Sequence, residues 1–240
     1  MRATEFVQIP FVFEKLEMVR ATHSGRVSSK DILDYYSGID ESYNRSSVEA
    51  RYNDLVHVDG SIFALPKHDR FLATFAIPLK FAKVNYLLGN YQGTIALCGF
   101  IGEMCTVFIY DFAHWCSKRK NGRKYDIPIQ SFERKGQKSR VEKLTSFGLI
   151  NEAYAKSFTR LNDIRNEHVH GYRIFSKELQ HDAKEAYGLA VRILLVAIGQ
   201  QITKSPADEW GKGAYVSVEH CHPLIIEFLE AKWKSRPVSQ

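Results

Sequence analysis

Three polar side chains close together in the second half of the chain could act on a phosphodiester: Arg165, Asn166 and His170. An imidazole has an ordinary pKa of about 6.5, so His170 could exchange a proton with a reacting group at cellular pH. A guanidinium stays charged and offers a fork of donors, so Arg165 could hold a phosphate and stabilise developing negative charge. Asn166 is about one helical turn from His170 and could orient it. These residue types suit RNA cleavage by attack of a 2′-hydroxyl on the neighbouring phosphate.

The spacing of these residues does not build a site on one straight α-helix. Positions 165 and 170 lie about 140° apart around an ideal helix, because each residue advances by about 100°. His168, three residues after Arg165, lies on the same face as Arg165 and is a secondary candidate. Either the helix unwinds toward Gly171, or a second chain completes the site.

The same residues also have a purely structural explanation. His168 and His170 near a helix C-terminus would complement the helix dipole, and Arg165 could pair with Glu167. From the residues alone, this explanation is preferred. Glu103 needs a partner because it lies in the most apolar segment of the chain. That partner is either Arg165, which would make Glu103 a supporting residue of the site, or a hydrogen-bond donor elsewhere.

A helix is expected to carry the polar cluster. Asn151 is a good N-cap, and the apolar stripe from Tyr154 to Ile164 leads toward Gly171. Glycine is typical of the position just after a helix end. The cluster is therefore predicted to lie at the C-terminal end of a helix that packs in a bundle, which we assign to residues 69–240.

The other elements of the predicted bundle are also helical. The segment from Ile95 to Phe112 has a wide apolar face, which suits a central helix. Further helices are predicted at Phe71–Leu88, where Pro78 should break the helix, after Ser176, and from Pro223 onward. The protein is therefore predicted to be mainly α.

Residues 1–68 have a different pattern. Three short helices followed by a hairpin at Asp59–Gly60 resemble a winged helix-turn-helix, a small α+β module. The resemblance covers about residues 8–68 and rests on the order of the elements. It implies DNA contacts from Arg45 and Arg51 on the third helix. A small docking module is the equal alternative, because the third helix also carries acidic residues.

Basic residues are concentrated between the predicted central helix and the helix that begins near Asn151. The chain has a net charge of +6, and residues 117–143 alone contain ten basic and three acidic residues. Such a run is often only a solvated face. However, its net positive charge is larger than that of the whole chain, which favours an exposed connection that binds nucleic acid. The predicted contacts are Lys118, Arg119, Lys120, Arg123 and Lys124.

Several other functional classes lack support. The four cysteines have no C-x-x-C spacing, and the consecutive His-Cys-His at 220–222 cannot easily converge on one metal ion. No Walker loop, G-x-G-x-x-G or G-x-S-x-G motif occurs. Glu103, Asp111 and His114 interrupt the apolar stretch from Thr94 to Cys116, so a core helix is preferred over a membrane span. We expect no metal, no cofactor and no membrane association. In the absence of a secretory signal, we expect a cytoplasmic protein.

The run Arg165–His170, followed directly by Gly171, resembles the R-N-x-x-x-H motif of HEPN domains. The resemblance covers about residues 80–235, and its specific part is six residues long. It implies a helical bundle that acts as a metal-independent ribonuclease and leaves a 2′,3′-cyclic phosphate. It also implies a homodimer in which two motifs line one cleft, often with a role as a toxin or in defence, and an inhibitory partner protein. The resemblance reverses the preference for the structural explanation.

Two other functions stay open at this stage. The chain could be a non-catalytic nucleic-acid-binding regulator that uses the winged helix, with the bundle serving for dimerisation. It could also be a helical scaffold that dimerises through the same face. The first predicts salt-dependent duplex binding without RNA cleavage, and the second predicts that motif substitutions change only the oligomeric state.

Overall fold

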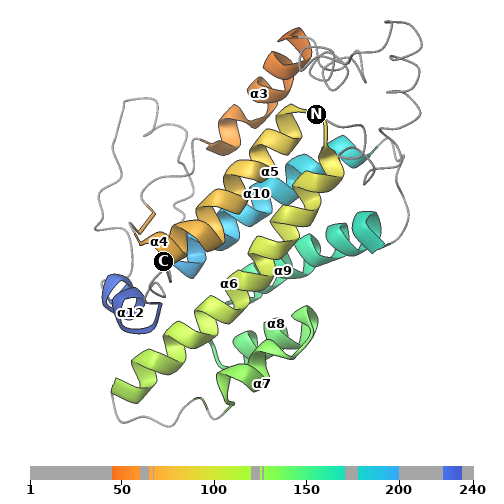
Figure 1. Cartoon of the computed structure of the whole chain (residues 1–240). Coiled ribbons are helices and arrows are strands. Elements are labelled where there is room, and N and C mark those ends of the chain that lie inside the picture. Colours follow the sequence, from red (N-terminus) through yellow and green to blue (C-terminus); the bar gives the residue numbers. More distant parts are fainter. Residues whose placement is uncertain are drawn as a thin grey trace, which may run out of the picture. The chain divides into compact units, whose positions relative to one another are not determined.

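The computed structural model describes residues 45–59, 65–66, 68–119, 125, 127–170, 178–199 and 224–233, with the backbone alone at 45, 56–59, 169 and 170 (Figure 1). In these ranges the chain is helical and has no β-strand, so the prediction of a mainly α protein is confirmed. The elements are α3 (Arg45–Asp59), α4 (Asp69–Phe71), η3 (Leu72–Ala76), α5 (Ile77–Leu87), α6 (Tyr91–Arg119), α7 (Ile129–Glu133), α8 (Gln137–Ser146), α9 (Glu152–Arg165), η4 (Asn166–His170), α10 (Leu179–Ala197) and α12 (Ile225–Lys232).

Residues 49–240 form one compact unit, and residues 1–48 form another. The described residues lie almost entirely in the larger unit. Most of the predicted winged helix lies outside them. Asp59, which was predicted to begin the hairpin turn, is instead the last residue of α3. The α+β character of residues 1–68 therefore stays a prediction.

Helix α6 is the centre of the larger unit. It contacts α5, α7, α8, α9, α10 and α12, and in Figure 1 it runs beside α5 and α10. By length and composition α6 could cross a membrane, but 56% of its most apolar window is buried inside the protein. A helix that is apolar on most sides and covered by others is typical of a bundle core. The core residues of α6 include Ile95, Cys98, Ile101, Cys105 and Phe108.

The segment before α5 contains a π-turn next to a proline. Pro78 lies in the first turn of α5, and η3 directly precedes that helix. A proline ring clashes with the carbonyl four residues earlier in an α-helix and removes one hydrogen bond. In the π-turn the Ile77 N–H bonds to the Leu72 carbonyl, five residues earlier. The break predicted at Pro78 is therefore wrong: the helical run continues, and a wider turn accommodates the proline.

Aromatic side chains fill the core beside η3. Phe75 is fully buried, packs edge-to-face on Phe108 and stacks on Trp233. Phe108 also packs edge-to-face on Phe228 of α12. These contacts attach the C-terminal helix to the bundle.

Helix α3 packs with the bundle rather than apart from it. Leu55 is fully buried in the common core. Arg51 is buried as well, and its guanidinium donates to the Leu87 carbonyl at 2.9 Å and to the Tyr91 hydroxyl at 3.1 Å. Arg51 was expected to contact DNA, but it is buried and donates two hydrogen bonds inside the unit. The expected boundary at residue 68 would separate Arg51 from these two partners.

The basic segment 117–143 is only partly a connection. Its second half contains α7 and α8, and Phe132 of α7 is buried against Tyr110, with ring centroids 4.0 Å apart. Val141 and Leu144 of α8 are also buried. This part of the segment is therefore a packed layer of the bundle, contrary to the expected exposed connection.

Helices α9 and α10 support the polar cluster. The Asn151 side chain accepts a hydrogen bond from the Tyr154 N–H at 3.0 Å, which confirms the predicted N-cap. Phe158, Leu161 and Ile164 of α9 are buried. Helix α10 presents a long apolar face and contacts both α6 and α9. The end of α9 is thereby held between two core helices.

Candidate functional site

The run Arg165–His170 lies across the junction of α9 and η4. Helix α9 ends at Arg165, and the π-turn η4 carries the next five residues. Hydrogen bonds in a π-turn run between residues i and i+5, so backbone positions five apart lie about one turn apart. Positions 165 and 170 have this spacing. The backbone therefore removes much of the 140° separation that a straight α-helix would impose.

Arg165 forms an ion pair with Glu103 of α6. Its Nη1 donates to Glu103 Oε1, and the two side chains are 26% and 31% exposed. The sequence left two possible partners for Glu103, and in the structure the partner is Arg165. A guanidinium has five N–H donors, and this ion pair uses one of them. The remaining donors of a partly exposed Arg165 are available to an anion.

Two glycines of α6 make room for α9. A methyl group at position 99 would overlap the Cγ–Cδ stem of Arg165, and one at position 102 would lie 2.9 Å from Leu161 Cδ2. Gly99 is one turn before Glu103, so the stem of Arg165 lies over the glycine while its head reaches the carboxylate. The absence of a side chain at position 99 is what permits this close approach.

Arg140 of α8 is a third charged residue at this place. Its Nη1 donates to the Glu103 carbonyl at 3.1 Å, and its Nε is buried without a partner among the described residues. Burial lowers the pKa of Arg140, and the charge of Arg165 lowers it further, while Glu103 and Glu133 oppose the change. The sequence grouped Arg140 with exposed cations, but it is buried because α8 packs on α6.

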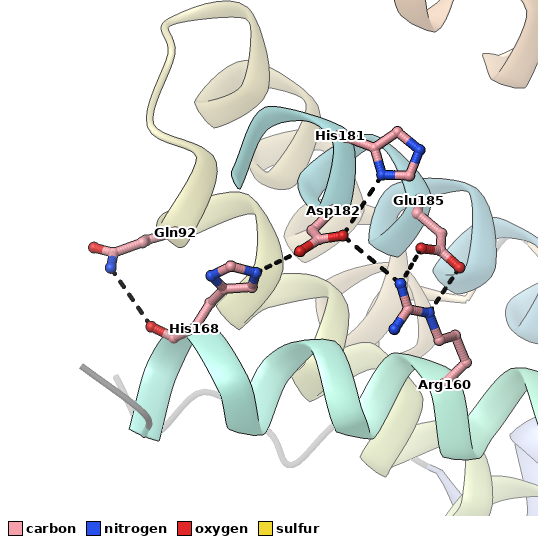
Figure 2. A network of polar contacts seen from close by, with 6 residues as sticks. All are labelled: Gln92, Arg160, His168, His181, Asp182 and Glu185. Carbon is pink, nitrogen blue, oxygen red and sulfur yellow. Dashed lines mark hydrogen bonds and ion pairs between the residues drawn. The ribbon is translucent and has the colours of Figure 1, made fainter. Parts of the chain in front are cut away.

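His168, the secondary candidate, is buried in the protein. Its Nε2 lies 2.6 Å from Asp182 Oδ2 of α10, and the two residues are 2% and 8% exposed. The His168 carbonyl accepts a long hydrogen bond from Gln92 Nε2 of α6, at 3.5 Å. Figure 2 shows His168 between these two partners. A side chain enclosed in this way cannot meet an RNA phosphate, so His168 is excluded as a residue that contacts substrate.

Asp182 connects this pair to a second group of charges (Figure 2). Arg160 Nη2 lies 3.7 Å from Asp182 Oδ1, and Arg160 binds both carboxylate oxygens of Glu185, at 2.9 and 2.6 Å. His181, Asp182 and Glu185 have ligand atoms within 4.8 Å of one another. Arg160 already neutralises two of these three groups, so we infer an ion-pair network rather than a metal site.

The other predicted contacts fall into two groups. Lys118 and Arg119 are exposed at the end of α6, where Arg119 pairs with Glu227 at 2.5 Å. Fifteen residues separate Lys118 from Glu103, about 22 Å along the helix, so these cations could only reach nucleotides distant from Arg165. Lys120, Arg123 and Lys124, together with the side chain of Arg45, lie outside the described residues.

The structure brings together part of the predicted site. Arg165 and Glu103 meet, and Asn166, which follows Arg165 in sequence, is exposed. For His170 the structure describes the backbone position only.

The residues that support the cluster from other helices were not predicted from the sequence. Asp182 had a detectable signal, because it is three residues after Leu179 and four before Ala186, so an acidic residue lies on the apolar face of α10. Gly99, Arg140 and Gln92 had none, since each acts through a contact with a distant segment.

No protein-family model matches the chain, and neither a curated protein nor a solved structure matches it.

Proposed function

We propose that the chain is a metal-independent endoribonuclease of the HEPN type. The observation that supports the proposal is the π-turn at the R-N-x-x-x-H run. Its hydrogen bonds join residues five apart, so positions 165 and 170 lie about one turn apart. Single π-turns are rare and frequently occur at functional sites. A helical bundle with the run at a helix end agrees with the family resemblance.

Each residue of the motif has a role in this proposal. Arg165 holds the scissile phosphate with the donors that Glu103 leaves free and stabilises the charge of the transition state. His170 takes the proton from the 2′-hydroxyl as its oxygen attacks phosphorus. As the P–O5′ bond breaks, His170 returns a proton to the leaving oxygen. Asn166 orients His170. The products carry a 2′,3′-cyclic phosphate and a 5′-hydroxyl.

The wider setting of the proposal rests on the family resemblance. We propose a cytoplasmic homodimer, a role as a toxin or in defence, and an inhibitory partner protein. The π-turn reduces the need for a second chain to complete the site, since positions 165 and 170 are about one turn apart in a single chain. Lys118 and Arg119, together with Lys120, Arg123 and Lys124, would bind the RNA backbone away from the cleaved bond.

The test is RNA cleavage by the purified full chain in EDTA. Wild-type protein should cut RNA and leave cyclic phosphate ends. Arg165→Ala and His170→Ala should each lower kcat/KM by about 10²- to 10³-fold, because each removes a group that acts in the transition state. Lys156→Ala is the matched control, since Lys156 is an exposed basic residue on the same helix. Undiminished cleavage by the two motif variants would exclude the assigned roles.

The alternative is a non-catalytic regulator that binds DNA through a winged helix. One of the two DNA contacts predicted for this alternative is not available, because Arg51 is buried and donates to Leu87 and Tyr91. Strongly salt-dependent duplex binding in the absence of RNA cleavage would favour it over the nuclease.

A further inference from the structure

His168 is the best anchored residue of the π-turn. Among the residues of η4 whose side chains are described, it alone is buried, whereas Asn166 is exposed and Glu167 is partly exposed. Its ring makes one polar contact within the described part of the chain, the 2.6 Å contact of Nε2 with Asp182, because Nδ1 is buried without a partner. The His168–Asp182 pair therefore attaches η4 to α10.

No neighbouring proline explains the π-turn η4. No proline lies between Pro128 and Pro206, so the explanation that holds for η3 does not apply. A π-turn is less favourable than the α-helix it replaces, and it persists only where the surroundings stabilise it. The described contacts that can stabilise η4 come from other helices, α6 and α10.

Two anchors on different helices account for the wide turn. Arg165 is held by Glu103 of α6, and His168 is held by Asp182 of α10. On a regular α-helix, residues three apart point only about 60° apart. A turn bonded from i to i+5 advances less per residue, so it separates these two side chains by a wider angle. A wider angle lets Arg165 reach α6 while His168 reaches α10.

We propose that the His168–Asp182 pair sets the π register of η4 and so determines where Asn166 and His170 lie relative to Arg165. His168 and Asp182 are then positioning residues of the proposed nuclease, and neither contacts RNA. Without the pair, the turn returns to the α register, and positions 165 and 170 move to about 140° apart. The effect on cleavage rests on the proposed function, but the effect on the register does not.

The first measurement identifies the hydrogen-bond partner of the His170 amide by NMR couplings across hydrogen bonds. In the π register this amide pairs with the Arg165 carbonyl, and in the α register it pairs with the Asn166 carbonyl. We expect the π pairing in the wild type and the α pairing in His168→Ala. Retention of the π pairing in His168→Ala would overturn the proposal, whether or not the protein cleaves RNA.

The second measurement follows RNA cleavage in the same variants. His168→Ala should lower kcat about 100-fold with little change in KM, because misplacement of a reacting group by about 1 Å has that effect. His168→Gln keeps a donor at similar reach and should recover both the π pairing and most of kcat. An equal loss in the Gln and Ala variants would contradict positioning through the Asp182 contact.

Two further variants separate positioning from folding. Asp182→Asn keeps the volume of the partner and should behave like His168→Gln if it still accepts the hydrogen bond. Glu185→Gln removes the neighbouring ion pair with Arg160 and makes no contact with η4, so it should leave the register and kcat unchanged. If Glu185→Gln shifts the register as much as His168→Ala does, the specific role of the pair is excluded. Should wild-type protein not cleave RNA, the proposed function fails while the register result still stands.

Discussion

The two π-turns in the described part of the chain, η3 and η4, are stabilised in different ways. Turn η3 contains the buried Phe75 and is followed by the buried Leu79. Pro78 lies close after the turn. Turn η4 follows the buried residues of α9, but its own described anchors are polar: the pair of His168 with Asp182 and a long hydrogen bond from Gln92 to the His168 carbonyl. Apolar contacts are non-directional and numerous, whereas one hydrogen bond is directional and can be removed by one substitution. A turn held by a polar pair can therefore position chemistry precisely and is also easier to disturb.

The largest effect on stability should come from the apolar core beside η3. Phe75→Ala should lower the free energy of unfolding by about 3–5 kcal/mol, because it removes a fully buried ring that packs on Phe108 and Trp233. The His170 amide should keep its partner, because η4 does not depend on this cluster. Denaturant titration gives the free energy, with Phe81→Ala as control, since Phe81 on α5 is 55% exposed. Equal losses in the two variants would mean that the core beside η3 is not packed as described.

A smaller effect on stability is expected at Gly99, over which the aliphatic part of the Arg165 side chain lies. A methyl group there must displace α9 or Arg165, which costs about 1–3 kcal/mol and is partly offset by the higher helix propensity of alanine. Gly99→Ala should therefore be less stable than the wild type and should shift the NMR signals of residues 166–170 while leaving those of residues 72–76 unchanged.

Gly136 provides the matched control for this prediction. It is the N-cap residue of α8, and no atom lies within 4 Å of the position of an added methyl group. Gly136→Ala should change stability by no more than about 0.5 kcal/mol. If Gly99→Ala were equally neutral, the close approach of α6 and α9 would not be what holds Arg165.

The smallest effect is expected for Pro78→Ala. A change of η3 to the α register would rotate α5 by about 100° relative to Phe75 and move Leu79 out of the core. We therefore expect the Ile77 amide to stay paired with Leu72, with a change in stability below about 1 kcal/mol. NMR couplings across hydrogen bonds would identify the partner. A shift to the α register would show that the proline alone maintains η3, and the contrast with η4 would then be one of local sequence rather than packing.

The sequence was sufficient for features whose cause is local. Helical periodicity located α6, α9 and α10, and the Asn151 cap followed from its side-chain chemistry. The R-N-x-x-x-H run is likewise a local pattern. The sequence failed at Pro78, because proline excludes the α register at its own position but does not specify whether a helix breaks or widens.

Contacts between distant segments decided the rest. Sequence periodicity shows which face of a helix is apolar, but not which helix meets it or where a charged side chain finds its partner. From the sequence, Arg51 and Arg140 were expected at the surface. In the structure each is buried and donates to a backbone carbonyl. Asp182 is fourteen residues from His168, and only the packing of α10 against η4 brings them to 2.6 Å.

What the sequence by itself determined is the helical class of the described residues and the position of the polar run at the end of a helix. What only the tertiary structure decided is the register of that run, since α6 holds Arg165 and α10 holds His168. The physical reason is that helix formation depends on neighbours within one turn, whereas the choice between an α-turn and a π-turn depends on where two anchors on separate helices lie.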